Sequence, residues 1–452
     1  MGITILGLGH GNPRALTLQV RDELDQASEI FLRTRDHPAV AALPTHLRVH
    51  SFDHLYETLN DFDAIYSGIA DDILERGEHG EVLYAVPGHP LFGEISVQKI
   101  LERAQEKNIP TRILAGVSFV DAACAALKLD PLAHGLQVAD ATDLARQNFP
   151  HLDPDQPALI AQLYSRAVAS DCKLTLLVLY PPDHAVTRID GAGTSTEKIE
   201  TLPLSDLDHA NYWAAPENNP SAPLPIAAQT PGHPFLLTTL FVPPLPRPSS
   251  LNALAEVVAH LRAPNGCEWD RAQTHRSLRK DFLEECYEVL ETLDQNDMPH
   301  LREELGDLLL HIFMQAQIAS ESGEFLLSDV CADISEKLVR RHPHVFANVK
   351  VNSTAEIIEN WDKIKQAENG GKKKKANFLP GLPALGRAQK IAKRIKASAD
   401  YADLAPQLKK LAHTRNRERD LGELLFAIAT YASSKHVDAE SALREIAQAK
   451  LE

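Results

Sequence analysis

The spacing of apolar residues changes near residues 245–250, and this change limits the chain to a two-part architecture. Before it, short β-like runs alternate with helical patterns; the runs lie at residues 3–9, 81–88, 112–117 and 174–180. That alternation is typical of an α/β domain. From Leu251 onward the pattern is helical almost throughout. At 452 residues the chain also exceeds one ordinary core, so we expect a multidomain protein with an α/β part followed by an all-α part.

Prolines mark the boundary between these parts. They crowd between residues 214 and 250, and the apolar stretch F-L-L-T-T-L-F-V inside this region reads as the last strand of the first domain. Further on, G-G-K-K-K-K at 370–375 reads as a solvated linker. The predicted divisions are an α/β domain at 1–246, a helical domain at 247–369, a Lys- and Gly-rich linker at 370–380, and a last helical segment at 381–452.

The last segment carries a diverged copy of part of the helical domain. R-D-L-G-E-L-L-F-A-I-A at 419–429 echoes E-E-L-G-D-L-L-L-H-I-F at 303–313, which indicates a repeated helical hairpin. The helix before the copied motif has no counterpart of the acidic residues described below. We therefore expect this degenerate copy to pack as a structural mate and to bind no metal.

Charge and composition exclude several classes of protein. The formal net charge is −16, which argues against a general nucleic-acid binder. No apolar run is long enough to cross a bilayer, and the first residues lack the pattern of a signal peptide. Five scattered cysteines without C-x-x-C spacing argue against zinc and disulfides. We expect a cytoplasmic protein that binds neither membranes nor, stably, nucleic acid.

Two acidic helix faces lie close together in the sequence of the helical domain. A helix over 302–316 places Glu304 and Asp307 in one stripe among leucines, which suits a site away from bulk water. The preceding helix over 281–293 places Glu284, Glu285 and Glu288 on one side. A short connection makes the two helices antiparallel neighbours.

Facing acidic stripes need a compensating cation. Oxygen ligands without cysteine favour a hard ion, Mg²⁺ or Mn²⁺. The alternative is that the helix over 281–293 is simply a solvated surface helix, which alone would be the simpler interpretation. Both stripes together favour the metal.

These residues resemble the MazG family of nucleoside triphosphate pyrophosphohydrolases. The resemblance rests on E-E-x-x-E at 284–288 and E-x-x-D at 304–307, and on motifs at 265–275, 337–346 and 361–368. It implies hydrolysis of a nucleoside triphosphate to the monophosphate and pyrophosphate. It also implies Mg²⁺ ligands and catalytic groups: Glu285, Glu288, Glu304 and Asp307 as ligands, with Glu284 a further ligand or the base that orients water.

Several basic and aromatic residues are candidates for substrate binding. Lys337, Arg340 and Arg341 share one helical face just before His342-Pro343. They would neutralise the triphosphate or, alternatively, balance neighbouring acids, and Lys365 would act likewise. Trp269 is the candidate for stacking on the base, although tryptophans in such positions more often belong to a core.

The first domain resembles the tetrapyrrole methylase family, whose members bind S-adenosylmethionine between two α/β subdomains. The resemblance rests on G-L-G-H-G-N-P-R-A-L-T at 7–17, Y-A-V-P-G-H-P-L at 84–91 and L-A-G-V-S-F-V-D-A-A at 114–123. It implies a cofactor site formed by Pro87, Gly88, His89, Pro90 and Ser118. His89 stands where many active members carry Asp, which leaves methyl transfer open, and it would equally serve as a polar cap on a turn. The order of the parts is similar to the YabN type of fused protein.

Two functions of different classes follow from these patterns. The first is a Mg²⁺-dependent pyrophosphohydrolase that acts on nucleoside triphosphates, with a methylase-like domain of open activity. The second is an S-adenosylmethionine-dependent methyltransferase whose helical half only dimerises or regulates. The intact acidic positions at 284–307 favour the first, because a purely structural copy is free to lose them, as residues 400–423 have. We also expect a homodimer.

Overall fold

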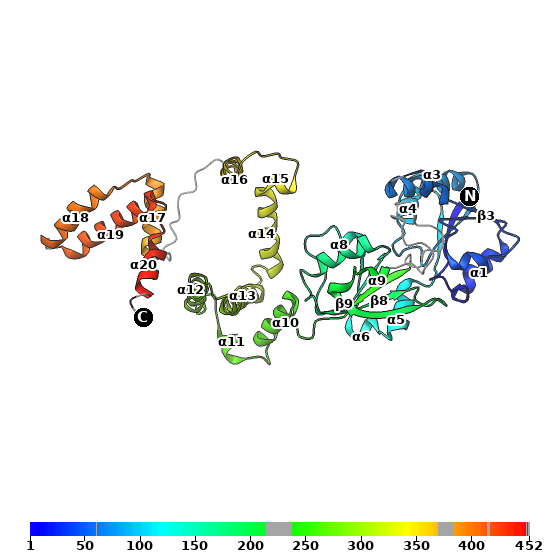
Figure 1. The fold of residues 1–452 in the computed structure, drawn as a ribbon, viewed down its shortest axis with the longest axis horizontal. Helices are drawn as coiled ribbons and strands as arrows, with labels where there is room; N and C mark the ends of the chain where they lie inside the picture. Colours follow the sequence, from blue (N-terminus) through cyan, green and yellow to red (C-terminus); the bar gives the residue numbers. More distant parts are fainter. Residues whose placement is uncertain (60, 214–236, 369–382, 414–415, 449, 451–452) are drawn as a thin grey trace. The chain divides into compact units, whose positions relative to one another are not determined.

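The computed structural model describes residues 1–59, 61–213, 237–368, 383–413, 416–448 and 450 (Figure 1). The chain forms two compact units, Met1–Leu254 and Ala255–Glu452. Each unit is described by itself. The predicted linker at 370–380 and residues 214–236 of the proline-rich region lie outside the described residues.

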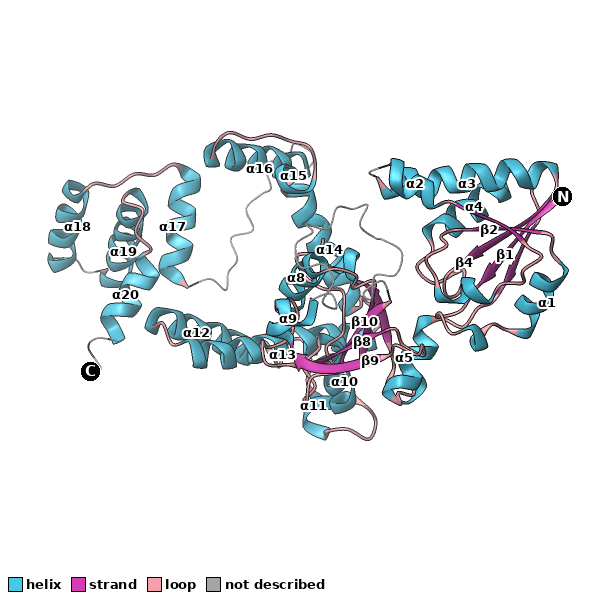
Figure 2. Ribbon diagram, turned by 45° about the vertical axis from the view of Figure 1, so that its right-hand side comes forward, coloured by secondary structure: helices cyan, strands magenta, loops and turns pink. Residues whose placement is uncertain are grey.

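The first sheet of unit 1 is parallel throughout, with the strand order β3-β2-β4-β1-β5. Side chains of β1 alternate between two cores. Ile3 and Ile5 pack with residues of α3 and α4 on one face, and Leu6 packs with residues of α1 on the other. Figure 2 shows α3 and α4 on one side of the sheet and α1 on the other. The elements of this part are β1 (Gly2–Gly7), η1 (Pro13–Ala15), α1 (Leu18–Gln26), β2 (Glu29–Leu32), η2 (Pro38–Ala42), β3 (Arg48–Ser51), α2 (Asp53–Thr58), α3 (Phe62–His79), β4 (Glu81–Val86), α4 (Ile95–Lys107) and β5 (Thr111–Leu114).

The second sheet of unit 1 has the order β6-β7-β10-β8-β9, in which only β6 and β7 pair in parallel. Its strand β10 confirms the last strand predicted for the first domain. The two sheets make this unit the predicted α/β fold with two subdomains. Its elements are α5 (Phe119–Leu127), α6 (Pro131–His134), β6 (Gln137–Asp140), α7 (Ala141–Leu144), β7 (Ala158–Ala161), α8 (Arg166–Leu176), β8 (Ala185–Asp190), β9 (Lys198–Pro203), η3 (Leu204–Asp206), α9 (Ala210–Trp213) and β10 (Thr238–Val242).

One predicted strand is wrong. Residues 174–180 end α8 and continue into a turn instead of pairing in a sheet. The Ser165 side chain accepts the backbone N–H of Val168 and starts this helix, and Cys172 and Leu176, four residues apart, are both buried on one face. A short apolar run fits a buried helix end as well as a strand, so the run alone could not distinguish them.

The described part of unit 2 is helical, as predicted, and it holds two helical hairpins. An ion pair joins α10 to α13 of the first hairpin, because the Arg262 Nη2 lies 2.7 Å from the Glu321 Oε2. Among the described helices of the protein, none carries an apolar stretch long enough to cross a membrane. The helices are α10 (Leu251–Arg262), α11 (Glu268–Ala272), α12 (Arg279–Gln295), α13 (Met298–Glu321), α14 (Leu327–Arg341), α15 (Pro343–Phe346), α16 (Thr354–Glu368), α17 (Ala384–Ile395), α18 (Tyr401–His413), α19 (Arg417–Ser434) and α20 (Ala439–Gln448).

Candidate functional site

A tight turn brings the two acidic helices together. Helix α12 ends at Asn296, whose φ of 56° is left-handed, a conformation that Asn tolerates at helix ends. The Asp297 carboxylate then accepts the backbone N–H of His300 and starts α13, with Pro299 in its first turn. Helices α12 and α13 therefore pack directly against each other as a hairpin.

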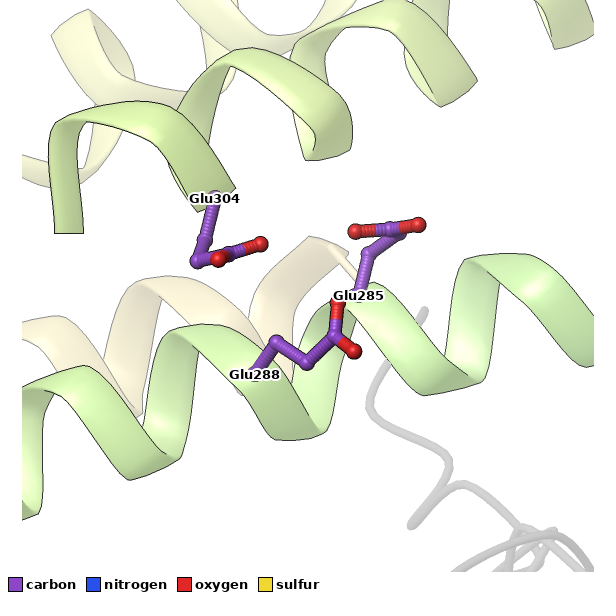
Figure 3. Close-up of side chains that lie close together, drawn as sticks. All are labelled: Glu285, Glu288 and Glu304. Carbon is purple, nitrogen blue, oxygen red and sulfur yellow. The ribbon is translucent and has the colours of Figure 1, made fainter. Parts of the chain in front are cut away.

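Three predicted metal ligands meet between these helices. Glu285 and Glu288 project from α12 and Glu304 projects from α13, and their carboxylates point toward one another (Figure 3). One carboxylate oxygen from each lies within 4.8 Å of the others. Oxygens at this spacing fit around one divalent cation, whose metal–oxygen distances are about 2.0–2.6 Å.

The electrostatics of the cluster also fit a cation. Burial, followed by the charge and hydrogen bonding of Glu288, raises the pKa of Glu285 to about 7. Burial and the charges of Glu288 and Asp307 likewise raise the pKa of Glu304. The carboxylates therefore resist being charged together, and a cation among them would relieve this repulsion.

The other two predicted acidic residues lie around this cluster. Asp307 is close enough for its charge to raise the pKa of both Glu285 and Glu304, but it is outside the group of three. Glu284 is exposed and lies 3.6 Å from the Lys280 ammonium. The structure thus assembles Glu285, Glu288 and Glu304, keeps Asp307 beside them, and turns Glu284 toward a lysine.

The candidate substrate-binding cations form a second group. Arg340 and Arg341, at the end of α14, bind the Glu368 carboxylate of α16 with nitrogen–oxygen distances of 2.8 and 2.6 Å. Hydrogen bonds from both arginines lower the pKa of Glu368 to about 2. Sequence analysis missed this role of Glu368, because the spacing of 28 residues from Arg340 gives no local signal.

The remaining candidates differ in their surroundings. Lys365 lies over the Trp361 ring, with 4.8 Å between its ammonium nitrogen and the ring centroid, and Arg341 lies over the same ring at 5.7 Å. Lys337 is half-buried on α14. Trp269 is 62% exposed, so it is not the core aromatic that the sequence favoured.

In the second hairpin, a lysine accompanies the acidic residues of the diverged copy. Asp420 and Glu423 of α19 occupy the copied motif, and the Lys410 ammonium of α18 lies 2.8 Å and 3.5 Å from their carboxylates. Asp420 is buried, with 7% of its surface exposed. In this copy the Lys410 ammonium offsets the negative charge of both acids. The helix before the motif carries this lysine instead of the glutamates found on α12.

In unit 1, the predicted cofactor loops follow β1, β4 and β5. Gly9 and Gly88 form an isolated backbone bridge that joins the first two loops, and a side chain at Gly116 would lie 2.2 Å from the Gly88 carbonyl oxygen. Gly88 has a φ of 65°. Glycine is therefore needed where these three loops cross.

Two predicted cofactor residues have structural partners. The His89 Nδ1 accepts the Leu91 backbone N–H at 3.1 Å, which is the turn cap that the sequence left open as an alternative. Ser118 starts α5 in a reciprocal capping pair with Asp121. Pro87 and Pro90 flank Gly88 and His89 in the same loop after β4.

A buried polar group beside these loops was missed by sequence analysis. Arg33 follows β2 and its Nη1 lies 3.3 Å from Glu94, whose side chain is 5% exposed. His37 is 5% exposed. The visible signal was a basic residue directly after the apolar run E-I-F-L, which alone is too common to single out.

Two protein-family models match separate parts of the chain. Residues 2–208 match the family model for tetrapyrrole (corrin/porphyrin) methylases, and residues 273–346 match the model for the MazG nucleotide pyrophosphohydrolase domain. The second match contains the α12–α13 cluster and ends after Arg341. Among solved structures, a uroporphyrin-III-C-methyltransferase from Thermus thermophilus is 21% identical, with a TM-score of 0.37 over 54% of this chain and 92% of that chain.

Relatives of known sequence cover both the helical part and the whole chain. A Thermotoga maritima nucleoside triphosphate pyrophosphohydrolase/pyrophosphatase, MazG, is 39% identical over 42% of this chain and 79% of that protein. An Escherichia coli nucleoside triphosphate pyrophosphohydrolase is 38% identical over 44% of this chain and 82% of that protein. A Bacillus subtilis protein described as the uncharacterized protein YabN is 35% identical over 98% of this chain and 90% of that protein. The chain therefore belongs to the YabN family, in which a tetrapyrrole methylase domain is followed by a MazG nucleotide pyrophosphohydrolase domain.

Proposed function

We propose that the α12–α13 hairpin hydrolyses nucleoside triphosphates to the monophosphate and pyrophosphate with Mg²⁺ or Mn²⁺, as a nucleotide-pool cleaning activity. The observation that carries this proposal is the meeting of Glu285, Glu288 and Glu304 within the segment that matches the MazG domain. Two relatives of the helical part are named for this reaction. A nucleotide substrate also suits the cytoplasmic location expected from the sequence.

The acidic residues divide the work at this site. Glu285, Glu288 and Glu304 would hold the metal, with Asp307 completing the set by a side-chain rotation. A bound divalent ion supplies charge neutralisation at the phosphates and lowers the pKa of a bound water. Glu284, at the edge of the cluster, would orient the attacking water once Lys280 releases it. By holding the metal, the three central carboxylates would also fix where the substrate phosphates bind.

The basic group on α14 and α16 would bind the triphosphate. Arg340 and Arg341 present guanidinium groups suited to phosphate oxygens, and Lys337 and Lys365 add charge nearby. Both arginines are engaged with Glu368, so substrate binding requires exchange of that carboxylate for phosphate. Trp269, with most of its surface exposed, is available to stack on the base.

For unit 1 we propose binding of S-adenosylmethionine at the crossing loops. Pro87, Gly88, His89 and Pro90 would contact the cofactor after β4, with Ser118 and its neighbouring backbone on the other side. The family match over residues 2–208 supports this second activity. In the alternative function, methyl transfer by this unit is the main reaction and the helical part only dimerises or regulates.

We further propose that the protein is a homodimer. The α12–α13 hairpin exposes large apolar side chains on its outer surface, among them Leu293 at 51% and Leu305 at 50%. A helical face of this kind is stable in water when another apolar face covers it.

The first experiment measures pyrophosphate and monophosphate release from a panel of ribo- and deoxyribonucleoside triphosphates with Mg²⁺. The wild-type chain is compared with Asp307→Asn and with Glu324→Gln, a matched control at an exposed acid beyond α13. Metal-dependent release that falls at least a hundredfold in Asp307→Asn and stays in Glu324→Gln supports the proposal. Absence of release from every nucleotide by folded protein would favour the methyltransferase alternative.

A further inference from the structure

One buried side chain of α13 takes no part in the site described so far. His311 is 8% exposed, and among the described residues its Nδ1 is buried without a hydrogen-bond partner. Buried polar atoms in native proteins nearly always have a partner. An unpartnered atom at this depth therefore indicates a partner that reaches it in another state of the protein.

His311 lies between the two helices of the first hairpin, next to the acidic cluster. Its ring meets the Phe282 ring of α12 edge to face, with 5.7 Å between the two centroids. Phe282 stands three residues before Glu285 on α12, and His311 stands four residues after Asp307 on α13. Because α12 and α13 pack against each other as a hairpin, the Phe282–His311 contact lies about one helical turn from the acids.

Asp307 is the polar group of α13 that His311 can reach. Residues four apart are neighbours on a helix surface, and helical side chains lean toward the N-terminus of their helix, so the His311 ring leans toward Asp307. The other residues one turn from His311 on α13 are apolar, apart from Gln315. The Gln315 Oε1 lies 2.5 Å from the His275 Nδ1, so this amide is already engaged.

Asp307 is also the ligand whose position has to change. It stands outside the group formed by Glu285, Glu288 and Glu304, although its charge raises the pKa of both Glu285 and Glu304. To complete the set of ligands, its carboxylate has to turn toward the other three. A carboxylate that ligates a metal is itself hydrogen-bonded by a neighbouring group, and this contact fixes its orientation. His311 is the neighbour that has a nitrogen to spare.

We propose that His311 positions Asp307 for the metal. With a divalent cation in the cluster, the Nδ1–H of His311 donates a hydrogen bond to the Asp307 carboxylate, and the contact with Phe282 keeps the imidazole in place for this bond. His311 is a positioning residue, because it acts through Asp307 and touches neither the cation nor the substrate. The inference rests on the proposed function, since it needs the cation that the hydrolysis uses.

The test measures binding of Mn²⁺ to the intact protein without nucleotide, from the electron paramagnetic resonance signal of the free ion. His311→Phe keeps a ring beside Phe282 but removes the donor, and we expect the Kd for Mn²⁺ to rise about tenfold. His311→Gln should keep a Kd near that of the wild type, because glutamine also donates to an aspartate four residues away.

The matched control is Phe313→Leu. It changes a buried side chain of α13 whose helical position lies away from the acidic stripe, so it should leave the Kd for Mn²⁺ unchanged even if it lowers stability. A second comparison shows whether the effect of His311 passes through Asp307. In an Asp307→Ala background, His311→Phe should change the Kd little further, because both substitutions remove the same interaction.

Three results would overturn the inference. Equal Kd values for the wild type and His311→Phe, or a full further tenfold loss in the Asp307→Ala background, would do so and leave the hydrolase proposal standing. Absence of Mn²⁺ binding by the folded wild type would overturn both. Should His311→Phe fail to fold, His311→Leu carries the test, because it removes the same donor with a smaller side chain.

Discussion

The protonation of Glu285 depends on its burial and on the carboxylates around it. In the folded chain its pKa is about 7, whereas an unfolded glutamate titrates near about 4.3. Between these values the folded chain holds more protons than the unfolded chain, so the free energy of unfolding falls as pH rises through this window. Above pH 7 the folded chain carries the full repulsion until a cation is bound.

This gives a pH-dependent prediction for the metal-free protein. With a chelator present, stability should be lower at pH 8 than at pH 6, with about 1 kcal/mol of the difference due to Glu285 after screening by solvent. Urea unfolding at both pH values measures it. Glu285→Gln should reduce the difference and Glu324→Gln should leave it unchanged. Added Mg²⁺ should restore the wild type at pH 8, and an unchanged pH difference in Glu285→Gln would refute the electrostatic account.

At the scale of elements, the ion pairs between α14 and α16 would control how readily Arg340 and Arg341 bind the proposed triphosphate. Glu368→Gln removes the carboxylate that engages Arg340 and Arg341, so both become available at lower cost. We expect the KM for the preferred nucleotide to fall about two- to fivefold with little change in kcat, because ion pairs screened by solvent are weak and their loss changes binding only modestly.

The matched control for this change is Glu359→Gln, which removes an exposed partner of Lys363 on the same helix. It should leave KM as in the wild type. A KM that stays constant or rises in Glu368→Gln would show that the two arginines do not contact the substrate.

The ion pairs between α18 and α19 make a second prediction at this scale. Lys410→Met removes the ammonium that lies 2.8 Å from the buried Asp420 carboxylate, and we expect the free energy of unfolding to fall. Denaturant unfolding measures this, with exposed Lys409→Met as the control. Equal stability of both variants would mean that the lysine plays no part in holding the second hairpin.

At the scale of the whole molecule, the exposed apolar surface of α12 and α13 predicts self-association. Light scattering should give about twice the 49.8 kDa mass of one chain. Leu293→Glu together with Leu305→Glu should shift the mass to that of one chain, because carboxylates do not desolvate against an apolar face. Leu174→Glu, at an exposed leucine of unit 1, is the control. A single-chain mass for the wild type would refute the dimer.

The whole molecule also shows which features a sequence can reveal. Helical spacing predicted that Glu285 and Glu288 share a face and that Glu304 lies opposite them. This was possible because all three residues belong to two consecutive helices joined by a short turn. The two-part organisation followed from the change in periodicity. By contrast, Arg33 and Glu94 meet because β2 and β4 are parallel neighbours, a relation that no local spacing encodes. The strand predicted at residues 174–180 was wrong for a different reason. A short continuous apolar run occurs both in buried strands and in buried helix ends, so periodicity alone does not distinguish them.

The lysine in the second hairpin has one more consequence. A bound metal ion can dissociate and is removed when a chelator competes for it. The Lys410 ammonium is covalently part of the chain and cannot be removed in this way. The second hairpin can therefore serve as an internal reference for the first. On chelation, amide hydrogen exchange should become faster around Glu304 and should stay unchanged around Asp420. One molecule would then report, in a single sample, what its cation contributes.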